Sequence, residues 1–164
     1  TEDHSFALLG DELDELDLTS NPIVLKENVK TRTVIIDIRD LDNPILHFNY
    51  ISDTKAIDHN GYVKGSKFYL ASYTSGLRVI DISNIQQKNI VEVGYFDTHK
   101  DDGHSHDIRV EFSNRKSDPG EHIGKKGQEI DAFNGAWSVY PFFNSENIII
   151  SDINSGLFIV KKSN

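Results

Sequence analysis

Residues 71–83, ASYTSGLRVIDIS, decide the fold of this chain because the sequence uses the same pattern again. Residues 151–161, SDINSGLFIVK, repeat its whole shape, which is an apolar segment, a turn on Ser-Gly and a second apolar segment. Residues 33–40, TVIIDIRD, repeat its second half. The spacing is 44 residues between Asp37 and Asp81. It is about 47 for the next pair of repeats once the polar stretch 99–131 is left out.

Short segments rich in Val, Ile, Tyr and Phe, bounded by Gly, Asn, Asp, Ser or Pro, follow one another along the chain. They predict strands at residues 6–9, 33–38, 45–50, 61–63, 67–72, 77–82, 90–96, 137–143, 148–151 and 157–160. Residues 11–17 have helical leanings but lack the length of a stable helix, so we expect a loop or a single turn. Repeats of this length with three or four strands are typical of β-propeller blades. A β-sandwich is the alternative, because its strands need not repeat in sequence.

The sequence therefore predicts an all-β chain, a β-propeller segment of about two and a half to three four-stranded antiparallel blades in an incomplete ring. The expected divisions are a first blade at 1–52 that lacks its inner strand, a second at 53–98, an insertion at 99–131 and a third at 132–164. Because these blades cannot close a ring, we expect the rest of its own propeller or a second chain to complete the sheet, and we expect the chain to be part of a longer protein.

Composition excludes several classes of function. The formal net charge is −9, with 26 acidic and 17 basic residues, which argues against nucleic-acid binding because phosphates need a basic face. This charge suits cation binding or simple solubility. The absence of Cys excludes disulfides, thiolate catalysis and zinc–thiolate sites. No apolar run approaches the roughly 18 residues of a spanning helix, so this segment is not expected to insert into a membrane.

Several segments together resemble the choice-of-anchor B family, whose members are built from LVIVD-type repeats. They are residues 9–15 (LGDELDE), the unit from 57–60 (IDHN) to 81–83 (DIS), 92–98 (EVGYFDT), 133–143 (FNGAWSVYPFF) and the last repeat, which ends at Phe158. The resemblance implies a β-propeller on a secreted or cell-surface protein, with no catalytic motif to carry over. It leaves out residues 17–30 and 99–131, which are longer and more polar than the loops of the family.

The second of these segments, residues 99–131, opens on a cluster of metal-ligand residue types. Imidazole with carboxylate suits zinc, nickel or iron, and the His-x-His pair would project to one face of a strand. Gly, Ser, Asp and Lys between the ligands are equally typical of a solvated loop. The candidate ligands are His99, Asp101, His104, His106 and Asp107.

An acidic run near the N-terminus supplies oxygen ligands that would suit calcium, and its candidate residues are Asp11, Glu12 and Asp14. It lacks the spacing of an EF-hand, and capping of a turn explains it as well. The cofactor predicted from both clusters is thus a divalent cation, calcium or zinc.

Asp58 and His59 begin a predicted inner strand and Trp137 holds the matching place in the next blade, so all three are expected at the central channel. Hydrogen bonding and inter-blade packing are the structural alternatives for these residues.

No catalytic residue is predicted, since the chain has neither a nucleophile elbow nor a phosphate loop. The favoured function is a non-enzymatic interaction module that displays loops to a cell-surface protein or glycan. Two alternatives stay open. One is a metal-dependent hydrolase or lyase that uses the insertion cluster, and the other is a calcium-stiffened structural surface domain.

Overall fold

The computed structural model describes residues 1–19, 24–26, 30–99 and 133–162. Within these ranges the chain is all-β, which confirms that part of the prediction, and its strands pair antiparallel. One turn of 3-10 helix, η1 (Ile85–Gln87), precedes the last strand of the largest sheet. None of the described residues forms a helix that combines the length and the apolar character needed to cross a membrane.

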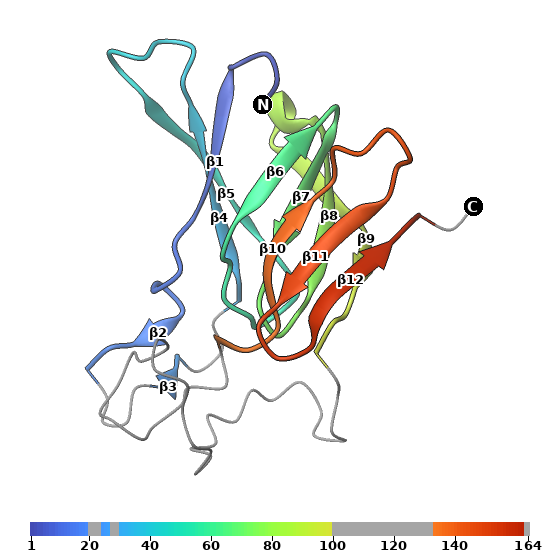
Figure 1. Ribbon diagram of the computed structural model, residues 1–164. Coiled ribbons are helices and arrows are strands. Elements are labelled where there is room, and N and C mark those ends of the chain that lie inside the picture. The colour runs from blue at the N-terminus through green and yellow to red at the C-terminus, as the bar shows by residue number, and fades with distance from the viewer. Residues whose placement is uncertain (20–23, 27–29, 100–132, 163–164) are drawn as a thin grey trace.

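Three sheets account for most of the strands (Figure 1). The N-terminal sheet has the order β1 (Phe6–Gly10), β4 (Arg32–Asp37) and β5 (Ile45–Ile51). The central sheet is a meander of β6 (Gly61–Lys64), β7 (Lys67–Ala71), β8 (Leu77–Asn84) and β9 (Asn89–Phe96). The C-terminal sheet is a meander of β10 (Ala136–Tyr140), β11 (Ile148–Asp152) and β12 (Gly156–Val160). Between β1 and β4, β2 (Leu16–Asp17) and β3 (Val24–Leu25) form a separate two-stranded ribbon.

The central sheet lies between the other two and is apolar on both faces (Figure 1). Alternate residues of a strand point to opposite faces, so each strand supplies side chains to two cores. The first core joins the N-terminal and central sheets through Phe6, Ile35, Phe68, Leu70, Ile80, Ile82, Ile85 and Ile90. The second joins the central and C-terminal sheets through Ala71, Leu77, Ala136, Val139 and Ile150. The three sheets are therefore stacked face to face in the order of the chain.

Two predicted segments differ in detail from the structure. The strand expected at 137–143 ends at Tyr140, because Pro141 has no N–H group to continue the ladder. The loop or turn expected at 11–17 is a turn only in its first part, where the Asp14 N–H donates to the Asp11 carbonyl at 3.2 Å. Leu16, 2% exposed, then begins β2.

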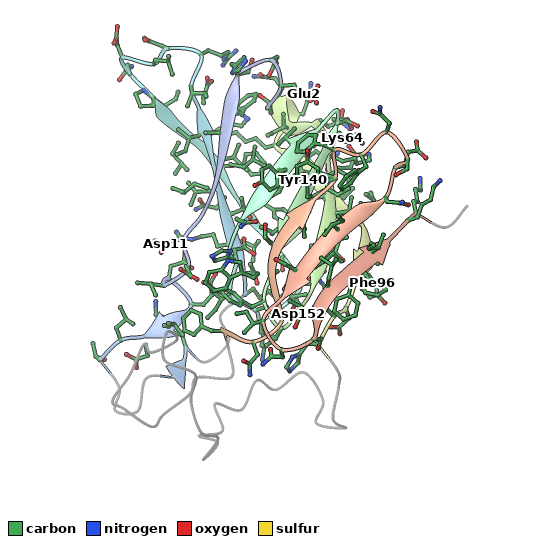
Figure 2. All side chains as sticks on the ribbon, viewed as in Figure 1. Glu2, Asp11, Lys64, Phe96, Tyr140 and Asp152 are labelled. Atoms are coloured by element: carbon green, nitrogen blue, oxygen red, sulfur yellow. The ribbon has the colours of Figure 1, made fainter. Side chains whose placement is uncertain are left out.

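Glu2 precedes β1 and Asp11 follows it, so these two labelled residues lie near opposite ends of this one strand (Figure 2). Near the first end, the Gly65 N–H donates to the Glu2 carboxylate at 2.7 Å, which ties the chain to the turn between β6 and β7. At the other end, the turn after β1 approaches the entry to β6 and the start of β10. The residues with the most distinctive chemistry meet there.

Candidate functional site

Glu12, His59 and Trp137, which the sequence places in separate segments, come together with Tyr73. We call these four residues the aromatic–acid site. Glu12 belongs to the turn after β1, His59 precedes β6, Tyr73 lies in the turn between β7 and β8, and Trp137 is in β10. The site thus draws on all three sheets.

Local backbone structure positions each side chain. The Leu13 N–H donates to the Asp11 carboxylate at 3.1 Å, which holds the turn that carries Glu12. The His59 N–H donates to the Ala71 carbonyl at 2.9 Å, so the pairing of β6 with β7 extends back to this residue. Trp137 lies at an irregularity of register between β10 and β11, where one extra residue turns its ring out of the regular alternation.

The rings pack on one another. The His59 ring lies 4.1 Å from the Trp137 ring, centroid to centroid, and meets the Tyr73 ring nearly edge-on at 5.4 Å. Phe133 adds a second edge-on contact to Tyr73 at 5.4 Å. Tyr73 is fully buried, whereas Trp137 keeps 45% of its surface exposed. The site is therefore a rigid aromatic base with an open tryptophan upon it.

Hydrogen bonds fix the polar groups. The His59 Nδ1 lies 2.5 Å from the Trp137 carbonyl oxygen, and because a carbonyl only accepts, Nδ1 carries the proton of this bond. The other nitrogen, Nε2, then faces the Glu12 carboxylate at 4.0 Å. The Tyr73 hydroxyl donates to the same carboxylate oxygen of Glu12. Glu12 is held at the edge of the aromatic base, with 39% of its side chain exposed.

Asp58 lies inside the protein, which corrects the expectation that it faces a channel together with His59. Asp58 is 1% exposed and accepts hydrogen bonds from the Thr33 hydroxyl at 3.0 Å and the Ser72 hydroxyl at 3.2 Å. Burial raises the pKa of Asp58 to about 7, although these two hydrogen bonds act in the opposite direction.

A second buried acid, Glu15, was not among the predicted site residues. It is fully buried, and one of its oxygens accepts from the Arg32 N–H at 3.3 Å. Burial, together with a hydrogen bond to Asp14, raises the pKa of Glu15 to about 8. The Arg32 side chain pairs with Asp14, with Nε to Oδ2 at 2.6 Å. The sequence signal that could have found Glu15 is its place just before Leu16, at the start of a paired segment.

The predicted calcium ligands of the N-terminal run have three separate partners. Asp11 accepts from the backbone of Leu13, Glu12 accepts from Tyr73, and Asp14 pairs with Arg32. In the ranges that the structure describes, no three His, Asp or Glu side chains are grouped so that they could hold a metal ion.

Of the insertion cluster only His99 is described, while Asp101, His104, His106 and Asp107 lie outside the described residues. The His99 N–H donates to the Asp97 carboxylate at 2.9 Å. His99 also lines a pocket of about 560 Å³ together with Asp97, Thr98, Asn154, Ser155 and Phe158. A metal bound by this cluster stays a prediction.

Comparisons with known proteins give no relative for this chain. No protein-family model, no curated protein and no solved structure matches it.

Proposed function

We propose that this chain is a β-propeller segment that acts as a non-enzymatic interaction module, and that the aromatic–acid site binds a cationic side chain of a partner protein. Three antiparallel sheets stacked face to face in chain order, built from a repeated sequence unit, support the propeller assignment. The resemblance to choice-of-anchor B proteins supports a place on a secreted or cell-surface protein.

The observation that carries the cation proposal is the pairing of a half-exposed tryptophan with a fixed carboxylate. The face of an indole ring attracts an ammonium or guanidinium group by about 0.5–2 kcal/mol, depending on how far the pair is desolvated. Glu12 presents an acceptor at the edge of the same platform, held by the hydroxyl of Tyr73. The net charge of −9 favours the approach of a basic partner over an acidic one.

The rigidity of the aromatic–acid site supports a role in binding. Tyr73 and Asp58 are buried, and His59 is fixed both by its ring contact with Trp137 and by its hydrogen bond to the Trp137 carbonyl. A preformed site loses little conformational entropy when a ligand binds. An arginine is a better ligand than a lysine, because its planar guanidinium both stacks on an aromatic ring and donates to a carboxylate.

Trp137 is the only tryptophan of the chain, so its fluorescence reports on the proposed site directly. We would titrate the full chain with a hexa-arginine peptide and, in parallel, with a hexa-glutamine peptide. The expected result is a saturable change in Trp137 emission with the arginine peptide alone. Replacing Glu12 by Gln should weaken the binding at least fivefold.

The matched control is Asp42→Asn, which removes one negative charge from an exposed turn of the N-terminal sheet. This variant should bind the arginine peptide as the original chain does. Equal weakening by Glu12→Gln and Asp42→Asn would mean that general charge attraction alone draws the peptide, and would refute the site. An unchanged Trp137 emission would refute it as well.

A further inference from the structure

The C-terminal sheet has an apolar outer face that no described part of the chain covers. Along β12, Phe158 and Val160 pack toward the central sheet. Leu157 and Ile159 alternate with them and therefore point to the opposite side, where they are 62% and 64% exposed. Cross-strand partners share a face of the sheet, so Ile149, opposite Ile159 in β11, extends this surface.

The N-terminal sheet has a corresponding outer face at the other end of the stack (Figure 1). Phe6 and Leu8 of β1 pack toward the central sheet, so Leu9 points away and is 52% exposed. Leu46 of β5 lies opposite Ile36 of β4 and is 61% exposed. The register places Ala7, Leu9, Val34, Ile36 and Leu46 on this one outer face.

The sequence repeat shows what normally covers each of these faces. Leu77 and Val79 hold in β8 the positions that Leu157 and Ile159 hold in β12, each counted from the same Ser-Gly turn. Leu77 is only 2% exposed, because the C-terminal sheet packs on it. The exposed outer face of the C-terminal sheet is therefore of the kind that accepts the sheet that follows it.

The N-terminal sheet shows the complementary case. Ile36, one residue before Asp37, holds in β4 the position that Ile80, one residue before Asp81, holds in β8. Ile80 is 1% exposed in the core between the N-terminal and central sheets. The outer face around Ile36 is therefore of the kind that accepts a preceding sheet.

We propose that copies of this chain associate head to tail, with the outer face of the C-terminal sheet of one copy packed on the outer face of the N-terminal sheet of the next. One copy presents both complementary faces, and such a contact continues the two sheet–sheet interfaces that the chain already forms. The register places only uncharged residues on the exposed part of the outer face of the C-terminal sheet, so the contact would bury no charge from that side: Ser138, Ile149, Ser151, Leu157 and Ile159. Because the contact joins two different faces, it generates a ring if the rotation closes and a filament if it does not.

This inference rests on the stacking of the sheets and is independent of ligand binding at the aromatic–acid site. Sedimentation velocity of the full chain over a range of concentrations tests it. The expected result is reversible association of the original chain. Two variants should each be monomeric, Leu157→Lys/Ile159→Lys on the C-terminal face and Leu9→Lys/Leu46→Lys on the N-terminal face, with circular dichroism confirming that both remain folded.

Mixing the two variants gives the decisive measurement. Each retains the face that the other has lost, so an equimolar mixture should form a dimer through one intact interface. Val91→Lys/Val93→Lys is the matched control, because these valines of β9 are 53% and 52% exposed but belong to the central sheet. A monomeric original chain would overturn the proposal and would mean that a different occupant covers these faces. A mixture without a dimer, or loss of association in the control, would overturn it too.

Discussion

The turn at Gly76 and the turn at Gly156 have the same local sequence pattern but different surroundings. Both glycines have positive φ, +69° and +83°, as a tight Ser-Gly turn requires. A Cβ atom at Gly76 would lie 2.3 Å from the carbonyl oxygen of Phe96, whereas at Gly156 it would meet nothing within 4 Å. The local sequence therefore specifies the turn in both places, and tertiary packing makes only the first intolerant of change.

The first residue of each turn also has a different role. In the central sheet, the Ser72 N–H donates to the Gly76 carbonyl, and the Ser72 hydroxyl is free to donate to the buried Asp58. In the C-terminal sheet, the corresponding Asp152 uses its carboxylate to accept the N–H groups of Asn154 and Ser155 at 2.9 and 2.8 Å. The central turn is tied to the core, and the terminal turn is closed by its own side chain.

Alanine at the two glycines should give the largest difference. We expect Gly76→Ala to lower the unfolding free energy by about 4 kcal/mol. Alanine must adopt a strained positive φ there, and its Cβ atom also displaces the backbone of β9. Gly156→Ala, which meets only the cost of positive φ, should cost about 1 kcal/mol. Urea unfolding of both variants measures the two values, and equal losses would show that packing around Gly76 does not matter.

Leucines that follow the two turns provide the second contrast. Leu77→Ala removes a buried side chain from the second core and should destabilise the protein by about 3 kcal/mol. Leu157→Ala alters a side chain that is 62% exposed, and should change the stability of the monomer by less than about 0.5 kcal/mol. Thermal unfolding at a low protein concentration, where association does not contribute, compares them. A large loss for Leu157→Ala under these conditions would contradict the exposure of this face.

Asp58, which accepts a hydrogen bond from Ser72, gives the third contrast, a change in how the unfolding free energy depends on pH, and its expected size is the smallest of the three. The folded pKa of about 7 lies above the ordinary value of 3.8, so the stability linked to this group is complete below pH 4 and is lost as the pH rises through 7. Glu15, with its pKa raised to about 8, acts in the same direction. Asp37 and Asp81, with pKa values lowered to about 2 by Arg39 and Lys67, oppose it only below pH 4.

The protein should therefore be more stable at pH 5 than at pH 8. Asp58→Asn keeps the shape of the side chain but cannot ionise. The unfolding free energy of this variant should therefore fall between pH 5 and pH 8 by roughly 2–3 kcal/mol less than that of the original chain. Urea unfolding at both pH values provides the comparison. The exposed variant Asp42→Asn should keep the full pH dependence, and an unchanged dependence in Asp58→Asn would show that Asp58 ionises normally in the folded protein.

Much of the fold could be predicted because it depends on local patterns. Alternating Val and Ile segments between turn residues located the strands, and the Ser-Gly repeats located the two turns. The irregular register that turns out Trp137 could not be predicted, since it depends on pairing between β10 and β11 rather than on either sequence alone. The predicted strand at 137–143 extends past Pro141 for a different reason, because its apolar pattern continues through Phe142 and Phe143 although Pro141 cannot continue the ladder.

The candidate site was predicted only in its separate parts. The residue types of Glu12, His59 and Trp137 singled them out, but their meeting depends on how three sheets stack. Tyr73 was missed because a tyrosine beside a Ser-Gly turn resembles a surface residue, and its burial follows from the ring contacts with His59, Phe133 and Trp137. Glu15 directly follows the acidic residues Asp11, Glu12 and Asp14 and has the same residue type as a solvated carboxylate, whereas the paired segment that begins at Leu16 buries it.

The two buried acids also change what an electrophoresis experiment would see. At pH 6 the folded chain holds protons on Asp58 and Glu15 that the unfolded chain releases. Folding therefore makes the net charge about two units less negative than the formal value of −9. The isoelectric point of the native protein then lies above the value of about 5.1 that the sequence gives. Unfolding makes the net charge more negative, which increases the electrophoretic mobility toward the anode. The expansion of the unfolded chain acts in the opposite direction and lowers the mobility.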